Sequence, residues 1–468
     1  MILNCFQGEG IVRRTRGEAC SFGKMGRTSG ADGAYTENIK TRREDGTMPN
    51  SRSRDPALTG NGRLQIGALA ADVGMPAGNA RIRLTPRGDS AQVIEEMISS
   101  TSGQSPVIDL PAPPVDFSLH PSEQKPYSEY DVSIQMEGYE PATVEGIQIL
   151  PNTTSYQDVI LHPLSNFEGE RETIGIESHT LWGDYPPKIP EEDTKELPAS
   201  TGLVVLPDPV IPEFVIVHAG APTNASAPNY WIPFSDYVKN VASNEIYATW
   251  PEQTITANVL AIISFTLNRV YTEWYRGKGY NFTITNSTAY DHAFNYGRNI
   301  FDEISRVVDE LFSTFVTKPN IRQPLLTQYC DGRSVSCPGW MTQWGSKDLG
   351  DKGYAAIDIL KRFYGYDIYL MQAKKIAGVP SSYPGAALQM GSTGQDVRVI
   401  QEQLNTISKN YPAIPKNRVD GVFGEATRKA VETFQSIFHL TSDGIVGFST
   451  WYKISDIYVA VTRMAELR

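Results

Sequence analysis

The chain has 468 residues, of which 53 are acidic and 42 are basic, giving a formal net charge of −11 at pH 7. This acidic balance argues against nucleic acid as a partner, because phosphate binding needs a basic surface. The length predicts about three domains, and no run approaches the roughly 20 apolar residues of a membrane-spanning helix.

Residues 1–60 are rich in Gly, Arg, Ser, Asp and Thr and show no apolar periodicity. This composition predicts a disordered or processed leader, and no function is assigned to Cys5 or Cys20. Basic side chains occur near the start, but neither an apolar stretch nor a small-residue cleavage site follows them. We therefore expect no recognisable secretory signal peptide.

The next region, residues 61–165, alternates apolar and polar residues in five segments separated by turn residues. The pattern predicts an all-β antiparallel sandwich with strands in RLQIGALAA, NARIRLTP, YDVSIQMEGY, TVEGIQIL and YQDVILHPL. The order of P-x-x-N-A-R-I and Y-x-V-x-I-x-x-x-G-Y resembles the transthyretin-like or carboxypeptidase-regulatory-like fold, with a long insertion at Gly88 to Gln124. Since no cluster of potential catalytic groups is present in this region, we expect a pro-region, an inhibitor or a placement module.

Residues 166–208 are acidic and contain four prolines between Pro186 and Pro198. Such a composition keeps a chain extended and hydrated, so it predicts an acidic, Pro-rich solvated linker. After it, residues 209–375 are predicted to form a central α+β region that begins with a strand at Glu213 to Gly220.

A carboxylate lies on an apolar helix face in the central region. Ser235 is the expected helix cap. The apolar positions then recur at spacings of three and four, and Glu245 continues the series Phe234, Val238, Val241. A glutamate at such a position is most often salt-bridged or at the edge of the apolar stripe.

The surroundings of Glu245 predict a raised pKa. The apolar helix face and the aromatic neighbours Tyr247 and Trp250 disfavour the charged form, and so does the macrodipole near the helix C-terminus. A carboxyl group that stays protonated near neutral pH can donate a proton to a glycosidic oxygen. A second apolar helix is predicted to begin at Pro251 and to end at Gly277.

This helix pair contains a family signature in the segment NEIYATWPEQTITANVLAIISFTL. The segment resembles the stage II sporulation protein D family of peptidoglycan lytic transglycosylases, whose acid/base glutamate corresponds to Glu245. Farther on, TQWGSKDLGDKGYAAIDILKRFYG resembles the closing motif of the family, with matches at Gln343 and Trp344. Ile263 and Cys337 replace an Arg and a His that are usual in the family, so the roles of those two residues are not transferred.

Aromatic and polar side chains outnumber charged ones around these motifs, which suits a groove for sugar rings. Gln343 and Asn286 are the predicted helpers of Glu245 in catalysis. The predicted substrate-binding residues of this region are Tyr247, Trp250, Ser287 and Trp344.

Cys330 and Cys337 are separated by six residues in a loop that contains Gly and Pro. This spacing allows either a small disulfide or two free thiols. A zinc site is less favoured, because His292 is the only histidine nearby in sequence and no Cys-x-x-Cys accompanies it. We therefore expect neither a metal ion nor a cofactor.

Residues 386–456 contain an internal repeat in which Asp420-Gly421 and Asp443-Gly444 each form a tight turn before a helix. The helical spacing of the flanking apolar residues predicts a small three-helix domain. The pattern resembles the type 1 peptidoglycan-binding module, and only this resemblance implies peptidoglycan as the ligand. The predicted binding residues are Asp420, Gly421, Asp443 and Gly444.

The order of the regions resembles the SleC-type spore cortex-lytic enzymes of clostridia. That resemblance implies a zymogen whose N-terminal part is removed by a germination protease, and we expect cleavage between the sandwich and Val204. It also implies a protein of the spore cortex or coat that is made inside the sporulating cell.

Hydrolytic glycosidases usually need two carboxyl groups, and the sequence offers one good candidate, Glu245. A lytic transglycosylase needs only one, because the C6 hydroxyl of muramic acid attacks its own anomeric carbon. We therefore expect cleavage between N-acetylmuramic acid and N-acetylglucosamine with a 1,6-anhydro product. The alternatives are an N-acetylmuramoyl-L-alanine amidase, a non-catalytic peptidoglycan-binding spore protein, and a muramidase that uses Asp291 or Asp236 as its second carboxylate.

Overall fold

The computed structural model describes residues 58–71, 75–164, 173–195 and 208–466, with side chains up to residue 462. The predicted leader lies outside the described residues as far as residue 57. None of the helices in these ranges is long and apolar enough to cross a membrane.

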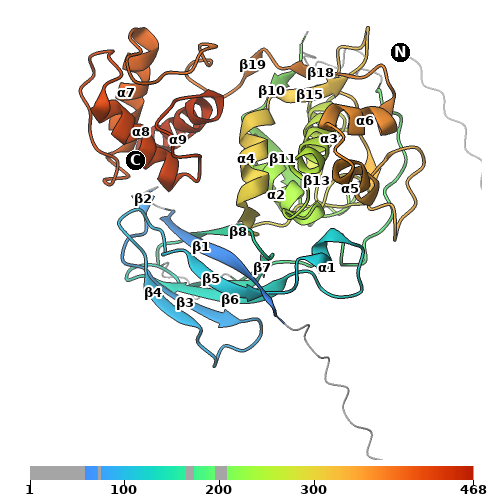
Figure 1. Cartoon of the computed structure of the whole chain (residues 1–468), viewed down its shortest axis with the longest axis horizontal. Helices are drawn as coiled ribbons and strands as arrows, with labels where there is room; N and C mark the ends of the chain where they lie inside the picture. Colours follow the sequence, from blue (N-terminus) through green and yellow to red (C-terminus); the bar gives the residue numbers. More distant parts are fainter. Residues whose placement is uncertain (1–57, 72–74, 165–172, 196–207, 467–468) are drawn as a thin grey trace, which may run out of the picture. The chain divides into compact units, whose positions relative to one another are not determined.

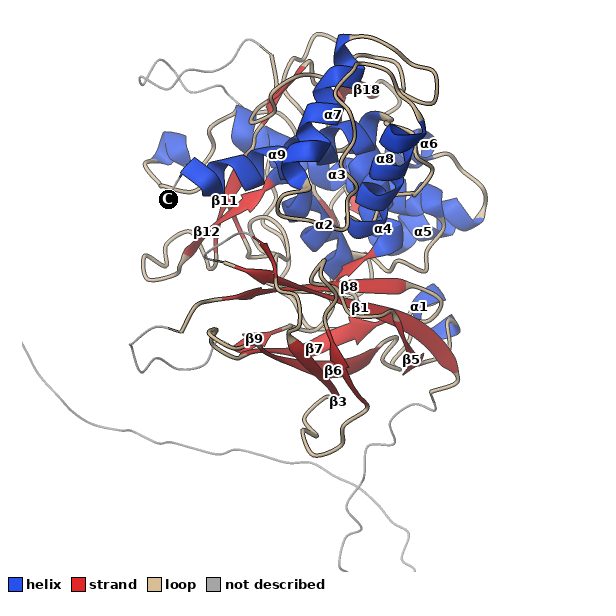
Figure 2. Cartoon of the chain, turned by 90° about the vertical axis from the view of Figure 1, so that its left-hand side faces the viewer, coloured by secondary structure: helices blue, strands red, loops and turns tan. Residues whose placement is uncertain are grey.

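Two β-sheets form the sandwich (Figure 2). One has the strand order β14-β8-β1-β2, with β5 paired to β1, and the other has the order β4-β3-β6-β7-β9. Alternate side chains such as Leu64, Ile82 and Val144 are buried between the sheets, which confirms the five predicted strands. The elements within the sandwich are β1 (Gly60–Ala70), β2 (Met75–Pro76), β3 (Arg81–Pro86), β4 (Glu95–Ile98), β5 (Ile108–Ala112), α1 (Asp116–Leu119), β6 (Ser128–Gln135), β7 (Ala142–Ile149) and β8 (Thr154–Leu161).

The prediction of a purely antiparallel sandwich is wrong at two strand pairs. β1 pairs with β8 in parallel, and β9 (Thr173–Gly175) pairs with β7 in parallel. A parallel pair needs a long connection, and the strands between β1 and β8 supply it. β14 (Ile300–Phe301) also joins the first sheet from the central region, with Ile300 opposite Tyr156 on β8.

Helix α3 (Glu252–Tyr271) lies at the centre of the region after the sandwich (Figure 1). Most of its side chains are buried because other helices and β15 pack around it. These helices are α2 (Phe234–Glu245), α4 (Asp302–Leu311), α5 (Gln343–Asp351) and α6 (Ala356–Tyr364). The short elements are β10 (Val210–Ile211), β11 (Phe214–His218), β12 (Asn229–Pro233), η1 (Arg276–Lys278), β13 (Ile284–Thr285), β15 (Thr314–Thr317), β16 (Tyr329–Cys330), β17 (Met341–Thr342), β18 (Tyr369–Gln372) and β19 (Lys375–Ile376).

The predicted ends of the two key helices need correction. The N-cap of α2 is Pro233, so Ser235 lies within the first turn and does not cap the helix. The second helix ends at Tyr271, six residues before Gly277, because Glu273 takes a positive φ of 50° that a right-handed helix does not allow.

The segment from residue 176 to 195, which we call the strap, packs against the central region. Ile176 is buried in the core of the sandwich and His179 beside Ile246 of the central region, so the prediction of a solvated linker is wrong for these residues. The Ile189 N–H donates to the Ala289 carbonyl at 2.7 Å, and the Leu326 N–H donates to the Asp193 carbonyl at 2.8 Å. The composition of this segment predicts a linker, but these backbone hydrogen bonds hold the strap against the central region.

Three helices form the C-terminal region, as predicted: α7 (Gln395–Ile407), α8 (Glu425–Ile437) and α9 (Phe448–Glu466). Their core includes the fully buried Ile400, Leu404, Val431 and Phe434. The helices bury one apolar face each, in agreement with the spacing of these residues.

Glu303 in the first turn of α4 links stability to pH. Burial raises the pKa of this carboxyl from the usual 4.5 to about 7, and its Oε2 has no hydrogen-bond partner among the described residues. Because the folded pKa is raised, ionisation above pH 4.5 favours the unfolded state, and the destabilisation is complete above about pH 7.

The Glu303→Gln variant removes this ionisation. It is expected to raise the free energy of unfolding at pH 8 by up to about 3 kcal/mol and to change it little at pH 4. Urea unfolding at the two pH values measures the difference. The exposed Glu310→Gln variant at the other end of α4 is the matched control, and an equal effect of both variants would contradict the assignment.

Candidate active site around Glu245

Glu245 is the last residue of α2, and its side chain is only 3 % exposed. Its Oε1 accepts a hydrogen bond from the Ala293 N–H at 2.6 Å, and its Oε2 accepts one from the Tyr329 hydroxyl. Burial raises the pKa of Glu245, although the nearby Lys188 and the two hydrogen bonds act in the opposite direction. The site thus contains the buried carboxyl of raised pKa that the sequence predicts.

A pocket adjoins this carboxyl, and three segments line it besides α2 and α5. These segments are the strap, the loop after β13, and β16 with the loop that follows it. The lining residues are Thr180, Gly183, Tyr185, Pro186, Lys188, Glu245, Thr288, Tyr329, Cys330, Asp331, Ser334, Val335 and Gln343.

Gln343 lies beside Glu245, as predicted from the closing motif. It is the first residue of α5, which Thr342 caps by accepting a hydrogen bond from the Gly345 N–H. The Gln343 Nε2 donates to the Glu245 backbone carbonyl at 2.9 Å. Gln343 therefore holds the end of α2 in place, and its direct part in catalysis stays a prediction.

Asn286 and Ser287 lie on the loop after β13, but neither lines the Glu245 pocket; Thr288 does. The Ser287 carbonyl instead accepts hydrogen bonds from the backbone N–H groups of Tyr290 and Asp291. These hydrogen bonds form a turn after Ser287, and in this loop only the residue that follows it lines the pocket. The structure therefore gives no support to the predicted roles of Asn286 and Ser287 in this pocket.

Three aromatic residues predicted to bind sugar pack against one another. They are Tyr247, Trp250 and Trp344. The Tyr247 ring centroid lies 5.8 Å from that of Trp250 and 6.2 Å from that of Trp344. Tyr247 and Trp250 are 2 % and 3 % exposed, and the Trp250 indole N–H donates to the Ser118 carbonyl. Neither ring offers surface to a sugar while the strap is in place, since the His179 ring on the strap lies 4.4 Å from that of Tyr247. Substrate binding by Tyr247 and Trp250 stays a prediction.

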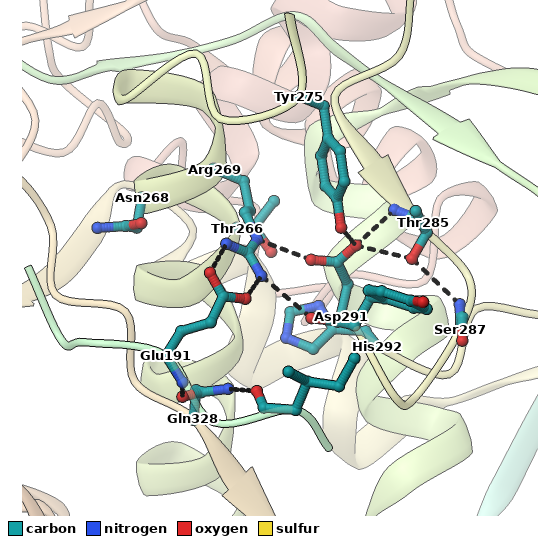
Figure 3. A network of polar contacts seen from close by, with 12 residues as sticks. Glu191, Thr266, Asn268, Arg269, Tyr275, Thr285, Ser287, Asp291, His292 and Gln328 are labelled. Carbon is teal, nitrogen blue, oxygen red and sulfur yellow. Dashed lines mark hydrogen bonds and ion pairs between the residues drawn. The ribbon is translucent and has the colours of Figure 1, made fainter. Parts of the chain in front are cut away.

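Asp291 belongs to a buried polar network (Figure 3). Its Oδ1 pairs with Arg269 Nε at 2.7 Å, and its Oδ2 accepts hydrogen bonds from the Tyr275 hydroxyl and from Thr285. Asp291 is fully buried in an ion pair with Arg269 and does not line the Glu245 pocket, so it does not serve as a free second carboxylate. Asp236 lines a different pocket from Glu245. These contacts disfavour the muramidase alternative.

The strap places Lys188 in the Glu245 pocket. The Lys188 ammonium donates to the Asp291 carbonyl and lies 5.3 Å from the centroid of the Tyr329 ring. Burial lowers the pKa of Lys188, while Glu245 and Asp291 favour its charged form. An internal segment therefore places a basic group beside the candidate acid.

Further contacts hold the strap on both sides of Lys188. The Thr180 N–H donates to the Asn244 carbonyl at 3.0 Å, next to Glu245. At the other side, the Glu191 carboxylate forms two bonds with the Arg269 guanidinium, at 2.6 and 3.1 Å (Figure 3). A forked ion pair of this kind fixes both position and orientation.

Cys330 and Cys337 form a disulfide, which resolves the alternative left open by their spacing. The bond closes the loop that follows Tyr329, the donor to Glu245. In the described ranges, no group of three or more His, Cys, Asp or Glu side chains is arranged to hold a metal ion.

Sequence reasoning missed three residues of the site: Tyr329, Lys188 and Arg269. Arg269 carried a signal, because it is a charged residue within an apolar helix pattern, where an unpaired charge is unfavourable. Lys188 lies in the run Tyr185–Pro186–Pro187–Lys188–Ile189–Pro190, whose apolar residues suggest contact more than solvation. Tyr329 carried no signal, since only the folded chain brings it to Glu245.

In the C-terminal region, the repeated Asp-Gly pairs are bound within the domain. Gln401 Nε2 donates to Asp420 Oδ1 at 3.1 Å, and its Oε1 accepts from the Gly421 N–H at 2.8 Å. Gln435 makes the same two contacts with Asp443 and Gly444, both at 2.8 Å. The repeat thus has a structural role, and glycan binding by these four turn residues stays a prediction.

The chain thus combines a buried acidic site in its central region with a helical domain in its C-terminal region. Residues 393–454 match the family model described as a putative peptidoglycan binding domain, within the predicted range of 386–456. The chain therefore carries a peptidoglycan-binding domain.

Two curated relatives share limited regions with the chain. It is 41% identical over 68 residues to the zinc D-Ala-D-Ala carboxypeptidase of Streptomyces albus G, which covers 14% of this chain and 25% of that protein. It is 30% identical over 104 residues to a spore cortex-lytic enzyme of Bacillus cereus, which covers 22% of this chain and 37% of that enzyme. The chain thus spans about a quarter to two fifths of these relatives.

Solved structures similar to parts of the chain include the SleB N-terminal domain. That match has 33% identity and a TM-score of 0.14, and it covers 16% of this chain and 93% of the other. The transthyretin of Sparus aurata matches at 19% identity with a TM-score of 0.15, covering 22% of this chain and 90% of the other. The resemblances of the sandwich to transthyretin and of the central region to the stage II sporulation protein D family stay predictions.

Proposed function

We propose that the chain is a lytic transglycosylase of spore cortex peptidoglycan, made as a zymogen. The observation that carries this proposal is Glu245, a buried carboxyl of raised pKa that adjoins a pocket next to Gln343. The peptidoglycan-binding domain and the similarity to spore cortex-lytic enzymes support cortex glycan as the substrate and the spore as the location.

In the proposed reaction, protonated Glu245 donates its proton to the oxygen that joins N-acetylmuramic acid to N-acetylglucosamine. The bond to the anomeric carbon breaks, and the N-acetylglucosamine end leaves with a hydroxyl group. The muramic C6 oxygen then bonds to the anomeric carbon while Glu245 accepts the C6 hydroxyl proton. A 1,6-anhydro end forms without water, and Glu245 is protonated again.

The hydrogen bonds to Glu245 suit both steps. The Tyr329 hydroxyl and the Ala293 N–H stabilise the carboxylate that exists between the two proton transfers. Burial favours the protonated form that begins the reaction. One residue can then act as acid and as base, since intramolecular attack benefits from a high effective molarity.

The strap supports a zymogen. A general acid must approach the glycosidic oxygen to about 3 Å, but Glu245 is only 3 % exposed, and strap residues such as Tyr185 and Lys188 line the pocket beside it. Displacing the strap residues that line the pocket would open the way for a sugar. A germination protease that cleaves the N-terminal part is the proposed trigger.

The products test the proposed reaction. We expect mass spectrometry of cortex peptidoglycan, digested by the proteolytically cleaved chain, to detect 1,6-anhydromuramic ends. Reducing muramic ends would indicate a hydrolase, and free stem peptides would indicate the amidase alternative. Unchanged glycan would indicate the remaining alternative, a non-catalytic peptidoglycan-binding protein.

A further inference from the structure

A second, open groove lies on the central region, outside the Glu245 pocket. Aromatic residues form much of its lining, together with parts of the strap. The aromatic residues are Trp274, Tyr275, Tyr280, Tyr290 and Trp340.

The same three segments line this groove and the Glu245 pocket. Lys188 lines the pocket and Ile189 lines the groove. In the loop after β13, Thr288 lines the pocket and Tyr290 the groove. The third segment continues from Cys330 in the pocket to residues 338–340 in the groove. The strap, the loop after β13 and the segment that begins at β16 therefore each contribute residues to both the pocket and the groove.

Tyr290 and Trp340 both line the groove, and each is only partly buried. The Trp274 ring differs, because the Lys278 ammonium lies 3.3 Å from its centroid. Flat apolar faces of aromatic rings suit the apolar faces of sugar rings, so Tyr290 and Trp340 are the surfaces available to a glycan.

The backbone holds both residues in place relative to Glu245. The Tyr290 carbonyl accepts a hydrogen bond from Arg269 Nη2 at 3.1 Å. Trp340 directly precedes β17, where Met341 pairs with Tyr329, the donor to Glu245. These contacts tie the backbone at both residues to the elements that surround Glu245.

We propose that this groove binds the glycan strand on one side of the bond that is cleaved, with Tyr290 and Trp340 stacking on its sugar rings. The proposal rests on the proposed function for the role of Glu245.

Site-specific binding tests this proposal in the full chain with Glu245→Gln. The seven tryptophans are labelled as 5-fluorotryptophan, and the Trp340 resonance is identified by its loss in a Trp340→Ala variant. Adding chitohexaose, a chain of linked N-acetylglucosamine, is expected to shift the ¹⁹F resonance of Trp340. Trp231 on β12 is 68 % exposed and outside the groove, so its resonance serves as the control. A Trp340 resonance that stays unchanged at saturating chitohexaose would overturn the proposal.

Kinetics of the cleaved chain separate this proposal from the proposed function. Trp340→Ala is expected to raise KM for cortex glycan about five- to tenfold, with kcat within about twofold, because stacking acts on binding. Trp231→Ala is expected to change neither. If glycan shifts the Trp340 resonance but no bond is cleaved, the proposed function is wrong and the proposal of glycan binding in the groove is retained. If bonds are cleaved but Trp340→Ala changes neither constant, the groove proposal fails alone.

Discussion

Replacing Glu245 with Gln is expected to lower the rate of glycan cleavage by roughly 10²- to 10⁴-fold, the usual contribution of a general acid or base. Gln keeps the size of the side chain but cannot donate a proton to the glycosidic oxygen or accept one from the C6 hydroxyl. The measurement is the release of 1,6-anhydromuramic ends by the cleaved chain. The Glu310→Gln variant, exposed on α4, should retain full activity.

The folded state should tolerate this substitution. Burial raises the pKa of Glu245, so ionisation above the usual pKa favours the unfolded chain, and Gln removes that effect. Thermal unfolding at pH 7 should therefore show no loss of stability. Full activity of a folded Glu245→Gln variant would rule out Glu245 as the acid and base.

The pH profile offers a further check on the same residue. Because Glu245 must be protonated at the start of the reaction, kcat of the cleaved wild-type chain should fall as pH rises through the raised pKa of Glu245.

Replacing Lys188 with Ala is expected to raise the activity of the uncleaved chain at least about tenfold, which corresponds to about 1.4 kcal/mol. The substitution removes a buried side chain from the pocket, together with a charge that lowers the pKa of Glu245. It also breaks the hydrogen bond from the strap to the Asp291 carbonyl. Turnover of cortex glycan by the intact chain, checked for integrity by mass spectrometry, gives the rate.

The cleaved chain supplies the internal control. Once the strap is displaced, wild type and Lys188→Ala should act at the same rate, and the exposed Lys352→Ala variant should resemble wild type in both forms. If cleavage activates the wild type while uncleaved Lys188→Ala stays inactive, another part of the N-terminal region is responsible for inhibition. Equal activity of cleaved and uncleaved wild type would show that the strap does not inhibit.

Local sequence patterns predicted the helix that carries Glu245, the five sandwich strands and the three C-terminal helices. The regular spacing of apolar residues is sufficient to predict these elements, although α2 is buried on nearly all sides and not on its apolar face alone. The helix ends were less accurate, since Pro233 and the positive φ of Glu273 depend on neighbouring turns.

The sequence by itself determined that a glutamate lies at the end of an apolar helix and that a peptidoglycan-binding domain follows. Only the tertiary structure decided what surrounds that glutamate. Ala293 and Tyr329, which are 48 and 84 positions away in the chain, donate hydrogen bonds to it. Lys188 enters its pocket on the strap, and Tyr247 and Trp250 are buried in the core. The physical reason is that long-range contacts depend on how separate elements pack, and periodicity records only which face of each element is buried.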